Sequence, residues 1–84
     1  MSAETRSRTY KDLGPLGDLL VRACVPDDNG VQSIPILARQ LGISAMSIYK
    51  WIRKVEVSGR RAAQVVQNSA GRVKLEDFDP YVYK

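Results

Sequence analysis

Apolar residues recur at three- and four-residue steps through most of this chain, which is the spacing of one face of an α-helix. The first such stretch covers residues 10–25, and its repeating positions are Leu13, Leu16, Leu20, Val21 and Cys24. Gly14 and Pro15 suit the start of a helix, so the regular helix is predicted to begin near them. Pro26 and the turn-forming segment 27–30 end it.

Two further helical patterns meet at a glycine with almost no loop between them. Ser33 is a favourable N-cap for the first, whose apolar stripe consists of Ile34, Leu37, Ala38 and Leu41. Gly42 follows, at the position where a left-handed backbone residue commonly ends a helix. Ser44 can cap the second helix, which extends to Lys54 and has an apolar side of Ile48, Trp51 and Ile52, with Val55 beyond.

The remaining chain predicts a fourth helix and a less regular end. The helix is expected from about Ser58 to Ser69, with Gly71 as its stop and an inward face of Ala62, Ala63, Val65 and Val66. The segment 72–84 predicts a short helical turn over 75–78, which ends before Pro80 and leads into an extended aromatic tail. A short strand is the alternative for this last segment.

Length and composition agree with one small domain. With 84 residues, 44% of them hydrophobic, the chain can form one compact core. The pattern therefore predicts an all-α bundle of four to five helices over residues 1–84, with the polar residues 1–9 fraying. No apolar run approaches the roughly 18 residues that span a bilayer. The first residues lack the apolar core of a secretory signal, so we expect a cytoplasmic protein of a bacterial cell or its virus.

The connection between the second and third helices restricts their geometry. Helices joined by so few residues cannot lie antiparallel and must cross steeply, as in a helix-turn-helix over residues 34–54. Ala38 supplies a small side chain at the closest approach, and Gly42 supplies a positive φ in the turn. Ile43 is expected to plug the inner side of the turn, and the wedge between the helices is filled by Leu37, Leu41, Ile48 and Trp51.

This spacing resembles the helix-turn-helix of the phage repressor and Cro superfamily, the lambda repressor-like fold. The match covers Ile34 to Arg53 and rests on Ala38, Gly42, Ile48 and Trp51. The following stretch, GRRAAQVVQNSAGRVKLEDFDPYVY, is similar to the tail of small Cro-like regulators. Many of those have a proline just before this tail, where the present chain has Val57, Ser58 and Gly59, which predicts a looser turn.

The resemblance implies that helix 44–54 enters the major groove of DNA, with two sets of contacts. Base contacts are expected from Ser44, Ala45, Met46, Tyr49 and Lys50. Phosphate contacts are expected from Arg39, Ser47, Arg53, Lys54, Arg60 and Arg61. Lys50 could donate to guanine, and Ala45 and Met46 could contact a thymine methyl group. Helix packing or solvent exposure is the alternative for Met46 and Tyr49, and a solvated charge is the alternative for Lys54.

The distribution of charge favours a nucleic-acid partner. The net charge is +4, and residues 39–61 hold six cations and one anion, a net of +5. The rest of the chain holds seven cations and eight anions, a net of −1. The positive excess therefore lies around the helix-turn-helix, although an ordinary solvated helix face could also carry it. Phosphate would repel Glu76, Asp77 and Asp79, so the C-terminal segment is expected to face away from DNA.

Catalytic and metal-binding chemistry has few candidates in this chain. There is no histidine, and the single cysteine, Cys24, lies in an apolar run typical of a buried small hydrophobic residue. The common zinc spacings and a Gly-rich phosphate loop are missing, and segment 27–30 is too short for an EF-hand. We therefore expect a protein that is not an enzyme and needs no metal or cofactor.

A regulator of this kind is expected to work as a homodimer. One recognition helix contacts only a few base pairs, and dimers on palindromic operators extend the contact. The aromatic cluster of the tail is the predicted dimer contact, made by Phe78, Tyr81, Val82 and Tyr83; folding back onto the chain's own core is the alternative. The leading hypothesis is a phage-type transcriptional regulator that associates with the nucleoid of the bacterial host. The alternative is an interaction or assembly module, such as an antitoxin or a DNA-packaging accessory protein.

Overall fold

The computed structural model describes residues 13–82, and within that range the chain is entirely helical apart from turns and one isolated β-bridge. Its elements are α2 (Gly14–Ala23), α3 (Ile34–Leu41), α4 (Ala45–Lys54), α5 (Gly59–Asn68) and the 3₁₀-helix η1 (Leu75–Tyr81). This confirms the all-α bundle that the sequence predicts. The expected fraying of residues 1–9 and the role given to Tyr83 lie outside the described residues.

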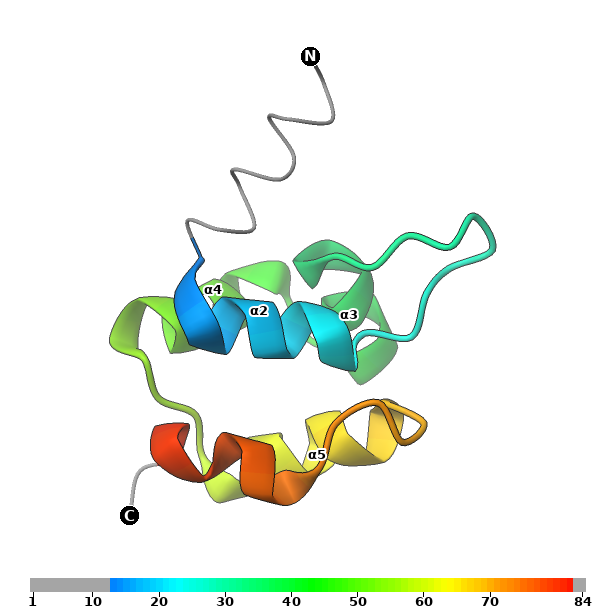
Figure 1. Ribbon diagram of the computed structural model, residues 1–84. Coiled ribbons are helices and arrows are strands. Elements are labelled where there is room, and N and C mark those ends of the chain that lie inside the picture. The colour runs from blue at the N-terminus through cyan, green and yellow to red at the C-terminus, as the bar shows by residue number, and fades with distance from the viewer. Residues whose placement is uncertain (1–12, 83–84) are drawn as a thin grey trace.

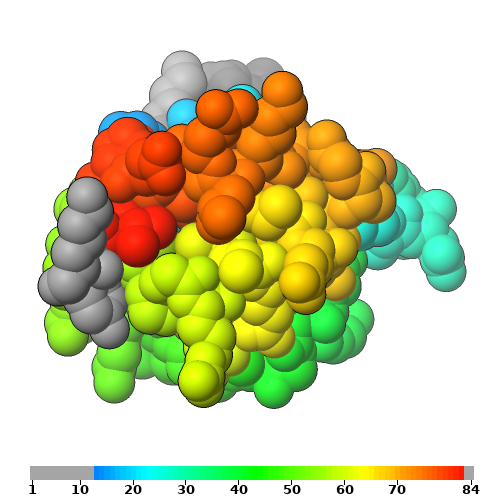
Figure 2. All heavy atoms as spheres, turned by 90° about the horizontal axis from the view of Figure 1, so that it is seen from below, coloured from blue at the N-terminus to red at the C-terminus, as the bar shows by residue number. Residues whose placement is uncertain are grey.

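The helices surround one core. In Figure 1, α2 lies across the front of the molecule with α3 and α4 behind it, and α5 and η1 lie below. Figure 2 shows η1 along one edge of the lower face and α4 along the other, with α5 between them. Each helix contributes fully buried side chains to the core, among them Leu16, Leu20, Leu37, Ile48, Val65 and Phe78.

Helix α2 begins at Gly14, with proline in its first turn, as the sequence predicts. Its buried face is formed by Leu16, Leu19, Leu20 and Ala23, and Cys24 just after the helix is also buried. Val21, predicted on the same face, is half-buried and packs against the edge of the core, because the centre of the buried face lies nearer Leu20 and Ala23.

Helix α5 starts and ends where the sequence indicates. The hydroxyl of Ser58 accepts a hydrogen bond from the Arg61 backbone N–H at 3.2 Å, so Ser58 is the N-cap. The helix ends at Asn68 with the fully buried Ser69 as its C-cap, so the predicted range of about Ser58 to Ser69 is confirmed. The Ser69 hydroxyl donates to the Val66 carbonyl at 2.8 Å and accepts from the Val73 N–H at 3.4 Å.

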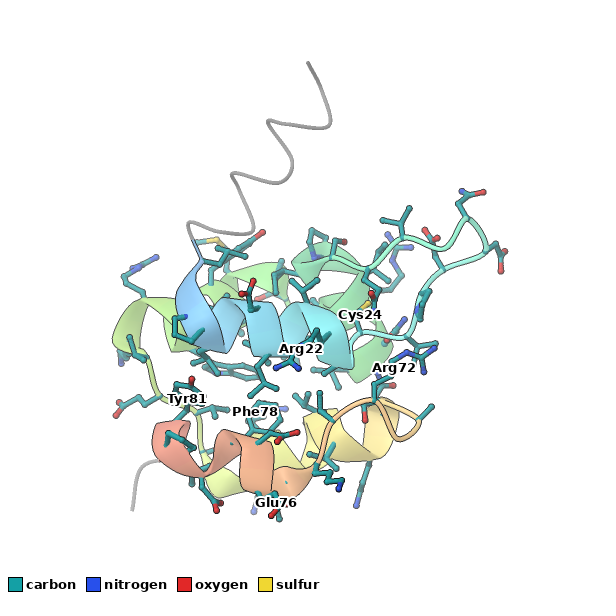
Figure 3. The ribbon with its side chains drawn as sticks, viewed as in Figure 1. Arg22, Cys24, Arg72, Glu76, Phe78 and Tyr81 are labelled. Atoms are coloured by element: carbon teal, nitrogen blue, oxygen red, sulfur yellow. The ribbon has the colours of Figure 1, made fainter. Side chains whose placement is uncertain are left out.

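The C-terminal segment packs on its own chain, which corrects two predictions. Phe78 is fully buried in the core, and Figure 3 shows its ring directed from η1 toward α2. A side chain with no exposed surface offers nothing for a second copy to contact, so Phe78 is not a dimer contact in this fold. Helix η1 also continues through Pro80 instead of stopping before it. A proline costs little there, because its fixed φ suits a helix and only one backbone donor is lost near the end.

The residues after Pro80 are tied to the segment between α4 and α5. The Val57 N–H donates to the Tyr81 carbonyl at 2.8 Å, and Val57 and Val82 form the isolated parallel β-bridge. Tyr81 and Val82 are half-buried and pack against the core. The end of the described chain is therefore part of the fold and not a free tail.

Candidate nucleic-acid interface

The start of α4 is held by the turn that follows α3. Gly42 has φ 73°, and its N–H donates to the Arg39 carbonyl at 3.2 Å. The Ile43 N–H donates to the Ala38 carbonyl at 3.0 Å, which completes a Schellman motif with Gly42 in the left-handed position. Residues 42–44 alone connect the helices, and Gly42 has the positive φ that the sequence predicts for this turn.

Ser44 caps α4 as predicted, and this engages its hydroxyl within the chain. The Ser44 Oγ accepts from the Ser47 backbone N–H at 3.2 Å and lies 3.1 Å from the Ser47 Oγ in a second hydrogen bond. The two serines predicted to contact DNA are thus bonded to each other. A base contact by Ser44 would have to share or replace these bonds.

The end of α4 repeats the Schellman geometry with a different residue. Val55 has φ 56° and ψ 40°, its N–H donates to the Ile52 carbonyl at 3.2 Å, and the Glu56 N–H donates to the Trp51 carbonyl at 3.1 Å. A β-branched residue in the left-handed region is strained. Val55 is also 54% exposed and lies beyond the apolar side of the helix.

The buried side of α4 is wider than the sequence predicts. Ile48 is fully buried at its centre, and Ala45, Tyr49, Trp51 and Ile52 pack half-buried against the core. At about 100° per residue, Tyr49 and Trp51 lie on opposite flanks of Ile48. Ala45 and Tyr49 were expected to point outward and are instead partly covered. Trp51 was expected in the core and lies at its edge.

The outward face of α4 carries Met46, Lys50 and Arg53, which follow one another at four- and three-residue steps. All three are exposed, and Met46, at 63%, is the most exposed of the large hydrophobic residues described. An apolar tip next to two cations on a capped helix is a surface that can contact base edges and phosphates together.

A hollow of about 350 Å³ separates α4 from the beginning of α5. Its lining includes the cations Lys50, Lys54 and Arg61, together with Ser47, Trp51 and the single carboxylate Glu56. The net charge of the groups that line this hollow is therefore positive, and the hollow lies on the flank of α4. Of the predicted phosphate contacts, it brings together Ser47, Lys54 and Arg61.

Arg61 is oriented by a chain of hydrogen bonds that sequence reasoning missed. Its Nη1 donates to the Gln64 Oε1 at 2.9 Å, and the Gln64 Nε2 donates to the Leu41 carbonyl at 3.1 Å. The side-chain amide of Gln40 links α3 to the segment that follows α2. It accepts a hydrogen bond from the Val25 N–H at 3.2 Å and donates one to the Val25 carbonyl at 2.7 Å. Glutamines on helix surfaces leave no pattern in a sequence that would single them out.

The other charged candidates lie apart from the hollow. Arg39 is exposed on α3, and Arg60 is exposed in the first turn of α5. The acidic residues Glu76, Asp77 and Asp79 are exposed on η1, at the edge of the lower face away from α4 in Figure 2. The acidic residues of η1 and the cations beside α4 thus lie on different edges of this face.

Cys24 is buried, and burial raises the pKa of its thiol above the ordinary value. The thiol therefore stays protonated at neutral pH, as expected for a packing residue. Among residues 13–82, no group of three or more His, Cys, Asp or Glu side chains could hold a metal ion. None of the helices described is long and apolar enough to cross a membrane.

Comparison of the chain with models of known protein families, with curated proteins and with solved structures gave no match.

Proposed function

We propose that the protein is a sequence-specific regulator of transcription that binds double-stranded DNA with α4 in the major groove. It acts by occupying an operator, as a phage- or prophage-type repressor of the Cro kind does, without catalysis. The observation that carries the proposal is the outward face of α4, where Met46, Lys50 and Arg53 project from a helix fixed at both ends. Rigid presentation of such a face is what base reading requires.

Within this proposal, Met46 and Lys50 are the principal base-reading residues. Lys50 donates to guanine O6 or N7, and the Met46 side chain packs on a thymine methyl group. Tyr49 contributes its hydroxyl from the flank, since its ring packs partly against the core. Ser44 and Ala45 contribute mainly to the helix itself, because one is engaged as the cap and the other is half-buried.

Phosphate contacts come from the cations around this face. Lys54, Arg61 and Ser47 line the hollow beside α4, which gives one strand of the backbone a positive channel. Arg53, Arg39 and Arg60 are exposed nearby in the sequence segment that carries the positive excess. These contacts supply affinity that falls as salt rises, whereas the outward face of α4 supplies the choice of sequence.

Selection of bound sequences from a random pool of duplex DNA tests the proposal directly. A palindromic consensus is the expected result, and retention of no sequence above background at low salt would refute DNA binding. That outcome would favour the interaction or assembly module, in which the same fold holds a protein partner.

Two substitutions then separate base reading from phosphate binding. Lys50→Ala should cost about 1–3 kcal/mol on the selected site and relax the preference at one position. Arg53→Ala should weaken binding to specific and random DNA alike. It should also reduce the slope of log K against log salt concentration by about one. Lys74→Ala is the matched control, because Lys74 is exposed at the start of η1, away from α4. If Lys50→Ala left both specific and random binding intact in gel shifts, the placement of α4 would be wrong.

A further inference from the structure

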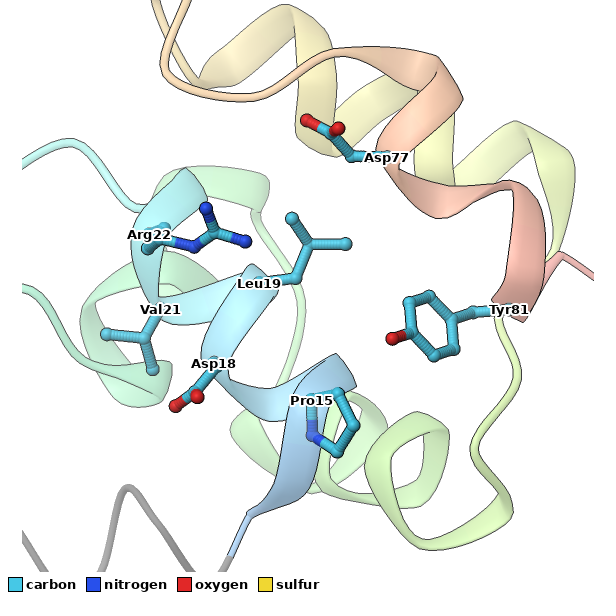
Figure 4. A pocket seen from close by; sticks show the side chains of 7 residues that line it. All are labelled: Pro15, Asp18, Leu19, Val21, Arg22, Asp77 and Tyr81. Atoms are coloured by element: carbon cyan, nitrogen blue, oxygen red, sulfur yellow. The ribbon is translucent and has the colours of Figure 1, made fainter.

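A second hollow, of about 520 Å³, lies between α2 and η1. Figure 4 shows it from close by, with Arg22 and Asp18 on α2 and with Asp77 and Tyr81 on η1. Leu19, which is 3% exposed, and Pro15 belong to the lining as well. The hollow therefore combines an apolar base with a charged rim, on elements that the proposed DNA contacts do not use.

The charges on α2 lack partners within the described chain. Asp18 and Arg22 are exposed, and no hydrogen bond or ion pair among residues 13–82 involves either side chain. Asp77, in contrast, accepts a hydrogen bond from the Lys74 N–H at 2.9 Å and stabilises the start of η1. Two opposite charges, one helical turn apart, thus stand free beside an apolar hollow.

This arrangement is complementary to itself. Asp18 and Arg22 lie four residues apart, so they project from the same side of α2, and Pro15 lies within about 60° of both around the helix axis. If a second α2 lies antiparallel to the first about a two-fold axis, Asp18 of each copy faces Arg22 of the other. The half-buried Val21 of each copy then lies on the same flank of the contact as Val21 of the other, because the two-fold axis pairs each flank of α2 with itself.

We propose that a second copy of this chain docks here, so that the protein forms a homodimer through antiparallel α2 helices. The proposal rests on the proposed function in one respect, because a palindromic operator requires two copies of α4. It moves the dimer contact from the aromatic tail, where Phe78 is buried, to the exposed side of α2, with Tyr81 at its rim. Charge complementarity favours a second copy of this chain over another partner. Asp18 precedes Arg22 along α2, so an antiparallel copy places a negative charge opposite each positive one.

Charge reversal tests the contact by sedimentation velocity of the full chain, in the absence of DNA, over a concentration series. The wild type should dimerise. Arg22→Asp and Asp18→Arg should each place like charges face to face and raise the dimer Kd by about tenfold or more. The double variant Asp18→Arg/Arg22→Asp restores complementarity and should recover the wild-type Kd. Arg39→Asp, an equal change of charge on exposed α3, should leave the Kd unchanged.

A wild type that stays monomeric throughout the series would overturn the proposal. So would single variants that dimerise normally, or a double variant that fails to recover. Thermal unfolding of each variant shows whether it is folded, since the reversals also exchange charges within α2. Binding to a single half-site, measured by fluorescence anisotropy, keeps the two proposals distinct. Half-site binding should persist in monomeric variants. A wild type that dimerises but does not bind the half-site would contradict the proposed DNA binding and would leave the α2 contact standing.

Discussion

The two turns on either side of α4 have the same hydrogen-bond pattern and different means of support. Each begins with a Schellman motif, and each ends with a serine that caps the next helix, Ser44 or Ser58. The first places Gly42 in the left-handed position, whereas the second places Val55 there. The first receives a side-chain hydrogen bond from Gln64 of α5 to the Leu41 carbonyl, whereas the second is bonded through its own backbone, from Val57 to Tyr81, far along the chain.

The difference shows how a fold can hold a residue that local preference opposes. A left-handed conformation costs a non-glycine residue about 1–2 kcal/mol. Complete burial of Val57, two residues later, contributes about 1.5–3 kcal/mol. The second turn is therefore fixed by its tertiary contacts, and the expectation of a looser turn at Val57, Ser58 and Gly59 is wrong. Each of the following substitutions tests one side of this comparison.

The largest effect is expected for Val57→Ala. The side chain is fully buried, so its truncation should lower the free energy of unfolding by about 2–3 kcal/mol in urea denaturation. Ile43→Ala, the corresponding change in the first turn, removes a half-buried side chain and should cost about half as much. Equal costs would mean that the two turns are supported in the same way.

Gly42→Val should be the next largest. A Cβ atom at Gly42 meets no atom within 4 Å, so the substitution isolates the cost of the positive φ. We expect a loss of about 2 kcal/mol in the same assay, and about 1 kcal/mol for Gly42→Ala. A neutral result for both would show that the first turn can change its backbone conformation freely.

Loss of the Ser44 cap and loss of the Ser58 cap should have similar effects on stability, both smaller than that of Gly42→Val. Ser44→Ala and Ser58→Ala each remove an acceptor that lies 3.2 Å from a backbone N–H, and each should cost about 1 kcal/mol. Thermal unfolding monitored by circular dichroism measures both, and glycine at the same positions should recover most of the loss. A much larger loss at Ser58 would indicate that its cap also holds the α4–α5 hollow in shape.

The smallest effect is expected for Val55→Gly, and it is a gain. Glycine relieves the left-handed strain at Val55 and loses part of this benefit through its freedom in the unfolded chain. The net change should be a stabilisation of about 0.5–1 kcal/mol, seen as a higher urea midpoint. Val55→Ala keeps the strain and should not stabilise. A destabilised glycine variant would show that the exposed valine has contacts of its own.

The comparison also explains how much the sequence could predict. Ser33, Gly42 and Ser44 work through hydrogen bonds within a few residues, so their pattern identifies α3, α4 and the turn correctly. Val55 and Phe78 depend on contacts between segments distant in the chain, which no local pattern contains. The same holds for η1, where Pro80 was expected to stop a helix that buried Phe78 keeps in place.

The candidate site follows the same division. Met46, Lys50 and Arg53 could be assigned to the outward face because helical spacing alone places them there. Tyr49 and Trp51 could not be placed, since their burial depends on how far the neighbouring helices reach around α4. The hollow beside α4 and the Arg61–Gln64–Leu41 hydrogen bonds require α5 to be in position, and nothing in residues 44–54 fixes that.

The hydrogen bond from Val57 to Tyr81 imposes an order on synthesis. Helices α2, α3 and α4 can associate before η1 is made, because the Schellman hydrogen bonds at Gly42 join only residues 38–43. The end of α4 must wait for Tyr81, which at roughly 5–20 residues per second follows Val57 by about one to five seconds. During that interval the strained valine has no tertiary support. The nascent chain should therefore acquire α4 early and the rigid end of that helix last.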